Sequence, residues 1–397
     1  MRLKINSLII GMSFFLIIFH TFTFLQAYYN FTITLLAFMF IFALSLMKSN
    51  GVFKIKDNPI IMLFFFVGIL IVVGVIFLKE DLLSMIGRYF PYILWPTLYV
   101  ITDRIMDSKS KKRFILCYMA IYAISVVATL RVVMIDNDAA RLLAGAASLE
   151  VRTVYYKMGV GGYGFIYGCV FILYGLLLWG DKEKTIWLKV LLYFLLAMTF
   201  VMIVFASYTT ALLLAIIVLL LSFYTKTERK NATVYFVLAI IAIMWLHRPI
   251  LKLIQDVASN MDLYWIENRI GQLLNADSEG SMSGLKRTGL YQMSLNSFVS
   301  NIFGGGEDIG GHSMVLDLLG RYGIWGGMFS IAFFSFLNCL RKTTKGRKGL
   351  IYVAFMVLMC INTSDSIVLL PMVLFVVPHI LSLVDSEEIV YEKTALN

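Results

Sequence analysis

Long apolar stretches recur from one end of the chain to the other, and they constrain the fold more than any other feature of the sequence. Their lengths are close to the roughly 20 residues that an α-helix needs to cross the hydrocarbon of a bilayer. Hydrophobic residues make up 60% of the 397 positions and charged residues only 15%, so a water-facing surface could not accommodate the apolar side chains. The stretches predict transmembrane spans near residues 6–25, 31–47, 59–78, 87–102, 114–134, 161–180, 186–205, 209–224, 232–247, 313–340, 350–364 and 366–384.

The predicted fold is therefore an all-α integral membrane protein with about twelve transmembrane helices, in which residues 1–397 form a single polytopic domain. Two connectors are much longer than the rest, 135–160 and 247–311. The second lies between the ninth and tenth spans and has apolar residues at helical spacing over 249–275, with a further short helix predicted over 286–299. We expect this large outer loop to be partly helical, with amphipathic helices on the membrane surface.

Basic residues gather in alternate connectors. The connectors near 26–30, 207–210 and 362–366 contain no Lys or Arg, whereas basic residues are frequent near 2–4, 48–56, 104–113, 182–184, 226–230 and 341–348. Because basic connectors stay on the cytoplasmic side, both termini are predicted to be cytoplasmic and both long connectors to lie outside. This distribution accounts for the formal charge of +10 without a nucleic-acid partner, and we expect none.

The cysteine and histidine positions predict neither a disulfide nor a metal site. His20 and His379 lie in apolar spans without a companion motif. All four cysteines also fall within predicted spans, apart from one another and without a CxxC pair, namely Cys117, Cys169, Cys339 and Cys360. The basic start of the first apolar stretch is followed by a long span, which we interpret as retained rather than as a cleaved signal peptide.

The region from 286 to 326 holds most of the residues that suggest chemistry. An Arg and a Tyr precede a glycine-rich polar turn, which leads to a His and a Ser at the start of the tenth span. The segments are Lys286-Arg287-Thr288-Gly289-Leu290-Tyr291, Asn301-Ile302-Phe303-Gly304-Gly305-Gly306-Glu307-Asp308-Ile309-Gly310-Gly311-His312-Ser313, Leu316-Asp317 and Tyr322-Gly323-Ile324-Trp325-Gly326. This order of an outer-loop Arg, a glycine turn, a His at the mouth of a late span and a G-x-x-G resembles the O-antigen polymerase and O-antigen ligase superfamily of bacterial surface-polysaccharide enzymes.

The resemblance implies transfer of a glycan from an undecaprenyl-diphosphate carrier to an acceptor hydroxyl at the outer face of the bacterial inner membrane. It implies no metal, nucleotide or other cofactor. The expected partners are the undecaprenyl-diphosphate-linked oligosaccharide, membrane lipids and a chain-length regulator protein. The expected product is O-antigen, capsule or exopolysaccharide.

Such a reaction needs fixed positive charge where the phosphate oxygens of the leaving group gather charge. Arg287 is the first candidate, because a guanidinium binds phosphate bidentately and stays charged at any working pH. Arg152, in the other long connector, is a second candidate and is assigned to substrate binding. Either Arg could instead face lipid headgroups or form a salt bridge within its loop.

His312 is the candidate base for the acceptor hydroxyl, because the ordinary pKa of histidine lies near neutrality. The alternative is an interfacial histidine without a catalytic role. Glu307 is a further catalytic candidate and Asp308 a substrate-binding one, although either carboxylate could equally cap the next helix.

The glycine run and three other polar residues complete the predicted substrate-binding set. Glycines let backbone N–H groups approach a diphosphate, or they form a plain tight turn. Asp317 and Arg321 lie four residues apart on one face of the tenth span, where they could pair with each other or line a wet cavity. The remaining members of the substrate-binding set are Tyr291, Gly304, Gly305 and Gly306.

Arg88 and Arg131 are left out of this set. They lie near outer span ends, and we explain them by snorkelling.

Two positions depart from the family pattern. After the seventh span, ligases and many polymerases carry an S-x-R-type turn, whereas this chain has Thr210 at the end of Ser207-Tyr208-Thr209-Thr210. Ser313 stands where ligases more often have Asn. Both departures favour a polymerase over an O-antigen ligase that transfers the glycan to lipid A-core. A lipid-linked glycan flippase or transporter is the alternative from another class, and it is disfavoured because no internal repeat is visible.

Overall fold

The computed structural model is all-α in the residues it describes, which confirms the all-α part of the predicted fold. It describes residues 2–48, 58–136, 138–143, 148–206, 208–226, 232–260, 267, 270–271, 274, 284–307, 309, 313–362 and 368–395. Helices cover most of each predicted span, and one of them, α10 (Ile186–Phe205), has the predicted bounds. The others are α1 (Arg2–Thr21), α2 (Phe31–Lys48), α3 (Asn58–Phe77), α5 (Pro91–Ile105), α6 (Ser108–Val133), α9 (Tyr163–Lys182), α11 (Thr209–Lys226), α12 (Ala232–Asn260), α16 (Ile324–Thr343), α17 (Leu350–Ile361) and, for the last span, α18 (Leu369–Pro371), the π-helical turn η4 (Met372–Val376) and α19 (Val377–Ala395).

Several of these helices are suited to a membrane. Within the described residues, six have the length and apolar composition needed to cross a bilayer: Pro59–Phe77, Ser108–Val133, Tyr163–Lys182, Ile186–Phe205, Ile324–Thr343 and Leu369–Ser386. Three further apolar helices are shorter, Ile5–Thr21, Phe31–Met47 and Thr210–Lys226. Large apolar side chains such as Phe65, Trp187 and Ile331 are exposed on the outside of the bundle, as expected where lipid is the solvent.

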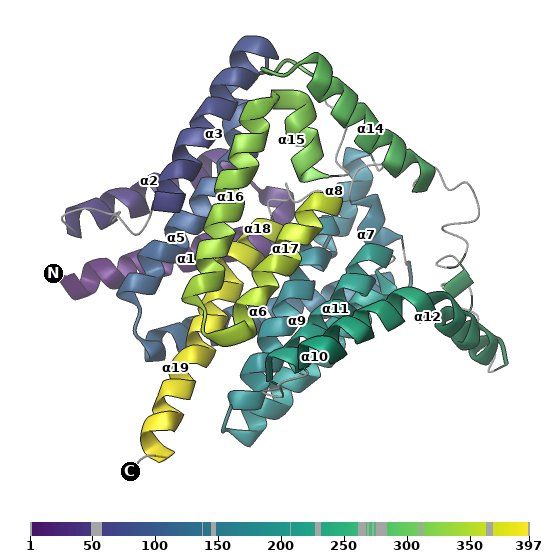
Figure 1. Cartoon of the computed structure of the whole chain (residues 1–397). Coiled ribbons are helices and arrows are strands. Elements are labelled where there is room, and N and C mark those ends of the chain that lie inside the picture. Colours follow the sequence, from purple (N-terminus) through teal and green to yellow (C-terminus); the bar gives the residue numbers. More distant parts are fainter. Residues whose placement is uncertain are drawn as a thin grey trace.

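The buried helix α9 forms the centre of the bundle, where it packs against α10, α11 and α19 (Figure 1). Glycines on α9 permit this close packing. A Cβ on Gly168 would lie 2.3 Å from the Met372 sulfur, and one on Gly175 would lie 3.1 Å from the side chain of Ile380. Small residues at such positions let helix backbones approach in an apolar solvent, where van der Waals contact is a main source of stability.

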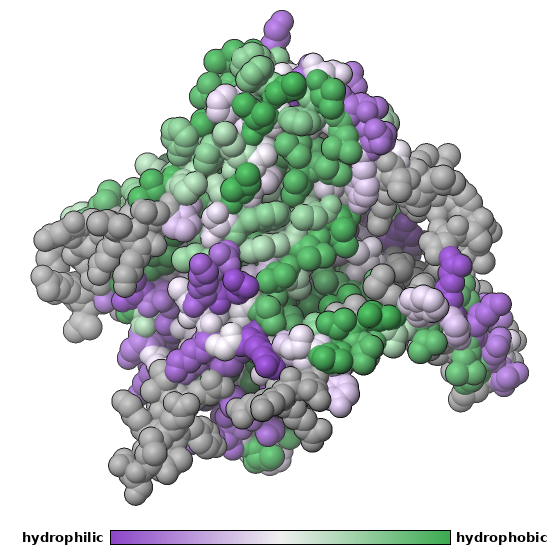
Figure 2. Space-filling view, viewed as in Figure 1, coloured by the Kyte–Doolittle hydropathy of each residue, from purple (hydrophilic) through white to green (hydrophobic). Residues whose placement is uncertain are grey.

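Several basic residues of the described connectors lie at one end of the bundle, where acidic side chains pair with four of them. Lys111 pairs with Asp103 over 2.6 Å, and Lys348 pairs with Asp385 over 2.6 Å. Two further pairs, Lys112–Glu183 and Lys226–Asp181, join α6 and α11 to the end of α9. In Figure 2, hydrophobic side chains cover the face over α3 and the upper part of α16, whereas hydrophilic ones gather lower, toward the end of α16 and α19. The described parts of four predicted basic connectors, 104–113, 182–184, 226 and 341–348, therefore lie at the same end.

Two predicted boundaries need correction. The span predicted over 313–340 is broken at Gly323, whose φ of 62° separates α15 (Met314–Tyr322) from α16. The helix of the ninth span does not end at 247 but continues as α12 to Asn260, with Pro249 inside it. The connector 135–160 contains two short helices, α7 (Ala139–Leu142) and α8 (Leu149–Lys157). The helix predicted over 286–299 is found as α14 (Gly284–Ser300), whereas most of 261–283 lies outside the described residues.

Candidate functional site

A helical hairpin, α14 and α15, lies at the end of the bundle away from the basic connectors (Figure 1). Ser294 Oγ donates to Asp317 Oδ1 over 3.1 Å, and Ser297 Oγ donates to the Gly320 carbonyl over 2.9 Å. Gly320 permits this approach, because a Cβ there would lie 2.8 Å from the Ser294 carbonyl oxygen. The polar face of α14 is therefore held directly against α15.

The glycine run 304–306 follows α14 and lies against the C-terminal end of α15. Gly304 and Gly305 have φ values of 109° and 99°, which favour glycine. The N–H groups of Gly305 and Gly306 both donate to the Arg321 carbonyl over 3.2 Å, and the Gly304 N–H donates to Asn301 O over 3.0 Å. These three N–H groups are thus engaged inside the protein, and the run positions the end of α15.

Three charged side chains meet beside this turn, and we call Glu80, Arg88 and Arg321 the Glu80 cluster. Arg321 Nε donates to Glu80 Oε1 over 3.1 Å, and its Nη2 contacts the same oxygen. Arg88 Nη1 lies 3.8 Å from Glu80 Oε2. The exposed fraction of the side chain is 14% for Arg321, 17% for Glu80 and 33% for Arg88. Two guanidinium groups therefore share one carboxylate, and water or a polar ligand can reach them.

The turn between α3 and α4 (Leu82–Tyr89) presents Glu80 to the cluster. Lys79 has a φ of 53°, and the Glu80 N–H donates to the Gly74 carbonyl over 3.2 Å. Asp81 Oδ2 then accepts from the Ser84 N–H over 2.9 Å and caps α4. Arg88 lies in the last turn of α4, where the helix dipole favours a positive charge.

Aromatic rings form the inner wall of the cluster. The guanidinium carbon of Arg321 lies 5.7 Å from the centre of the Tyr322 ring. Tyr322 is fully buried and meets Tyr89 edge to face, with ring centres 5.7 Å apart. The charged groups are therefore backed by packed side chains on one side and open on the other.

The start of α15 is tied to the end of α17. Ser313 Oγ accepts from the Leu316 N–H over 3.2 Å, and the Ser313 N–H donates to Asp317 Oδ2 over 3.3 Å. The Met314 N–H donates to the Asn362 carbonyl over 3.2 Å. Asp317 therefore caps its own helix and holds α14 through Ser294, while Arg321 reaches across to Glu80.

The structure brings the glycine run to Arg321 and places Asp317 against α14. Six residues of the predicted substrate-binding set lie on the α14–α15 hairpin or in its connecting segment: Tyr291, Gly304, Gly305, Gly306, Asp317 and Arg321. The Tyr291 hydroxyl donates to the Ile361 carbonyl over 2.9 Å. Glu307 is exposed at the end of the glycine turn. Arg152 lies half-buried on α8, which packs against α7 and against η1 (Thr23–Tyr28).

Three of the predicted residues cannot be placed. The backbone of Arg287 belongs to α14, but its side chain lies outside the described part of the structure, as do Asp308 and His312. Sequence reasoning misses two cluster residues, because it gives no role to Glu80 and explains Arg88 by snorkelling. One observation could have found them. The connector that holds Glu80 is predicted to lie on the same side as Arg321, and it offers a carboxylate to a span that carries a guanidinium.

The chemistry that this arrangement offers is the binding of an anion by guanidinium groups. In the described ranges of the chain, no group of three or more His, Cys, Asp or Glu side chains is placed to hold a metal ion. No model of a known protein family matches the chain, and no curated protein matches it either.

Proposed function

We propose that the protein is a multi-pass enzyme of the bacterial inner membrane, with about twelve spans and cytoplasmic termini. It polymerises undecaprenyl-diphosphate-linked oligosaccharide repeats into O-antigen, capsule or exopolysaccharide. The proposal combines the resemblance of the 286–326 region to polysaccharide polymerases with the charged cluster that this region forms with Glu80 and Arg88.

The observation that carries the proposal is the position of the Glu80 cluster. Charged groups in a membrane protein are costly and usually mark a functional site. This cluster lies where α16 begins, whereas the basic connectors lie where α16 ends, so the positive-inside rule assigns the cluster to the outer side. A lipid diphosphate at the outer surface can replace Glu80 as the partner of one of the two guanidinium groups, because phosphate oxygens also pair bidentately with guanidinium.

In the proposed reaction, the acceptor hydroxyl oxygen attacks the anomeric carbon of the donor sugar and forms the new glycosidic bond. The bond from that carbon to the diphosphate oxygen breaks, and the lipid diphosphate leaves with the electron pair. Arg321 and Arg88, together with Arg287, stabilise the charge that gathers on the phosphate oxygens. His312 takes the proton of the acceptor hydroxyl, and Glu307 is the second candidate for that role.

The test is the length distribution of the surface polymer in cells that carry Arg321→Gln, Arg287→Ala or His312→Ala. Each variant should abolish long-chain polymer while single-repeat products persist and the protein stays at normal abundance in the membrane. Lys342→Gln is the matched control, because it removes a charge from an exposed residue at the other end of α16. It should leave the ladder of polymer lengths on a gel unchanged. Normal ladders in all three site variants would refute the proposal.

A deletion strain separates the proposed function from its two alternatives. Loss of a polymerase leaves single repeats, whereas loss of a ligase leaves finished polymer on its lipid carrier. Loss of a flippase leaves the lipid-linked repeat on the cytoplasmic face. Reporter fusions that place 247–311 on the inner side would exclude the proposed polymerase and the ligase together.

A further inference from the structure

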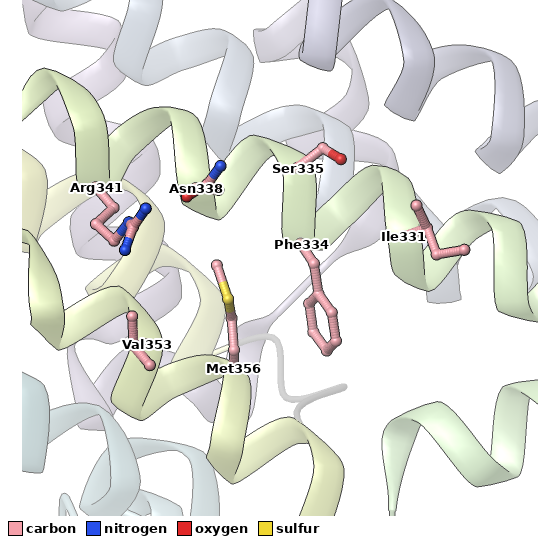
Figure 3. A pocket seen from close by; sticks show the side chains of 7 residues that line it. All are labelled: Ile331, Phe334, Ser335, Asn338, Arg341, Val353 and Met356. Atoms are coloured by element: carbon pink, nitrogen blue, oxygen red, sulfur yellow. The ribbon is translucent and has the colours of Figure 1, made fainter.

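An open groove lies between α16 and α17, at the end of α16 that is remote from the Glu80 cluster. Its volume is about 400 Å³. Figure 3 shows Arg341 and Phe334 reaching from α16 toward α17, where Val353 and Met356 face them. The walls are apolar apart from three polar side chains of α16, Ser335, Asn338 and Arg341.

These three polar side chains have no partner within the part of the chain that the structure describes: no hydrogen bond or ion pair holds any of them. Neighbouring basic residues differ in this respect. Lys348 pairs with Asp385 over 2.6 Å, and the Arg347 guanidinium stacks 4.6 Å from the centre of the Tyr224 ring. A half-buried guanidinium in apolar surroundings is costly without a counter-ion. The groove therefore offers a cation, an amide and a hydroxyl to a ligand.

The polar side chains follow one stripe of α16 in a definite order. With a rise of 1.5 Å per residue, Asn338 lies about 4.5 Å and Ser335 about 9 Å along the helix from Arg341, toward the middle of the bundle. Phe334 and Ile331 come next, and Ile331 is largely exposed. The order is cation, polar groups and then apolar wall. A glycerophospholipid presents a phosphate, ester groups and acyl chains over a similar length and in the same order.

We propose that this groove binds an anionic glycerophospholipid, with its phosphate on Arg341, its glycerol ester region beside Asn338 and Ser335, and one acyl chain along Phe334 and Met356. A guanidinium pairs bidentately with phosphate. The connector that follows α16 carries the exposed basic residue Lys345, so a net negative lipid is favoured over a zwitterionic one. This inference does not rest on the proposed enzymatic function, because it needs only a bilayer around the bundle.

The test is a titration of the purified full-length chain with phosphatidylglycerol, in which native mass spectrometry measures lipid retained after release from the micelle. Phosphatidylcholine is the zwitterionic reference. We expect the first phosphatidylglycerol to bind about tenfold more weakly to Arg341→Gln, which corresponds to about 1.4 kcal/mol. Lys342→Gln removes the same charge from an exposed neighbour outside the groove and should change the affinity less than twofold. A second variant, Ser335→Trp, fills the groove without changing charge and should weaken retention of phosphatidylglycerol as well.

Three outcomes would overturn the proposal. Equal losses in Arg341→Gln and Lys342→Gln would mean that diffuse surface charge attracts the lipid. Equal retention of phosphatidylcholine and phosphatidylglycerol by the unaltered protein would remove the case for an anionic ligand. A change in the proportion of dimer in Arg341→Gln, with phosphatidylglycerol retention unaltered, would make the groove an interface between two copies of the chain.

Discussion

Gly323, the residue between α15 and α16, should be among the positions least tolerant of a methyl group. Its φ is 62° and its ψ is −141°. In Gly323→Ala, the added Cβ would lie 2.0 Å from the carbonyl oxygen of Ile302 and 2.7 Å from the backbone nitrogen of Gly304. Both atoms belong to the turn that carries the glycine run. That turn must therefore move by more than 1 Å to restore an ordinary contact, which begins near 3.4 Å.

The cost can be worked out against Gly346, which has a φ of 60° but no atom within 4 Å of the position that an added Cβ would take. Gly346→Ala should lower the free energy of unfolding by about 1–2 kcal/mol, which is the cost of placing alanine in a left-handed backbone conformation. Gly323→Ala adds the loss of hydrogen bonds that the displaced turn makes, including Ile324 N–H to Ile302 O at 2.8 Å and the two N–H groups on the Arg321 carbonyl. At about 1 kcal/mol each, these losses make Gly323→Ala at least about 3 kcal/mol more destabilising than Gly346→Ala, because the φ and ψ of Gly323 also lie in a region that almost only glycine adopts. That difference is about 100-fold in the unfolding equilibrium constant.

Reversible unfolding in mixed micelles of increasing sodium dodecyl sulfate, followed by far-ultraviolet circular dichroism, measures both free energies of unfolding. If Gly323→Ala lies within about 1 kcal/mol of Gly346→Ala, the collision with Ile302 does not control the break between α15 and α16. The turn would then be free to move, and the glycine run would not fix the position of Arg321.

Two further predictions concern charged pairs at opposite ends of the bundle. Glu80→Gln and Arg321→Gln should each lower the free energy of unfolding by about 2 kcal/mol, a value between those for exposed and buried pairs. The loss in the double variant should be smaller than the sum of the two single losses by at least about 1 kcal/mol. Additive losses would mean that the two side chains do not interact. Burial alone would raise the pKa of Glu183, but the Lys112 ammonium and the Thr185 N–H together lower it below its ordinary value. The Glu183 carboxylate therefore stabilises the protein above the ordinary Glu pKa of about 4.3. This contribution should disappear as the pH falls through the lowered pKa. The melting temperature of Lys112→Gln should therefore depend less on pH between about 3 and 7 than that of the unaltered protein.

The helices could be predicted from the sequence because each apolar stretch is bounded by local features. The predicted and observed bounds of α10 agree since Lys182 and Lys184 precede it and the polar segment from Ser207 follows it. The break at Gly323 could not be predicted in this way. Residues 313–340 form one apolar pattern, and a glycine inside such a pattern does not by itself end a helix. The contact with Ile302, which lies 21 residues earlier in the numbering, decides that conformation.

The sequence predicts only those residues of the site that lie close to one another along the chain. Tyr291, Arg321 and the glycine run occur in one motif, and the structure places them in one hairpin. Glu80 lies 241 positions before Arg321, and the spacing of apolar residues within a helix carries no information about which distant connector faces it. Position relative to the membrane restricts the choice, because only residues on the same side can meet. Such a constraint selects a set of partners and not a single one.

The glycine run holds the end of α15, from which the Arg321 side chain extends. Two of its N–H groups hold the Arg321 carbonyl, and a Cβ on Gly306 would lie 1.9 Å from the Gly320 carbonyl oxygen. The run therefore fixes the last turn of α15 against α14. From that turn the Arg321 side chain reaches Glu80, on an element that belongs to the first third of the chain. The Arg321 guanidinium thus joins the α14–α15 hairpin to the turn that follows α3, and any ligand that competes for it alters a contact between two parts of the fold.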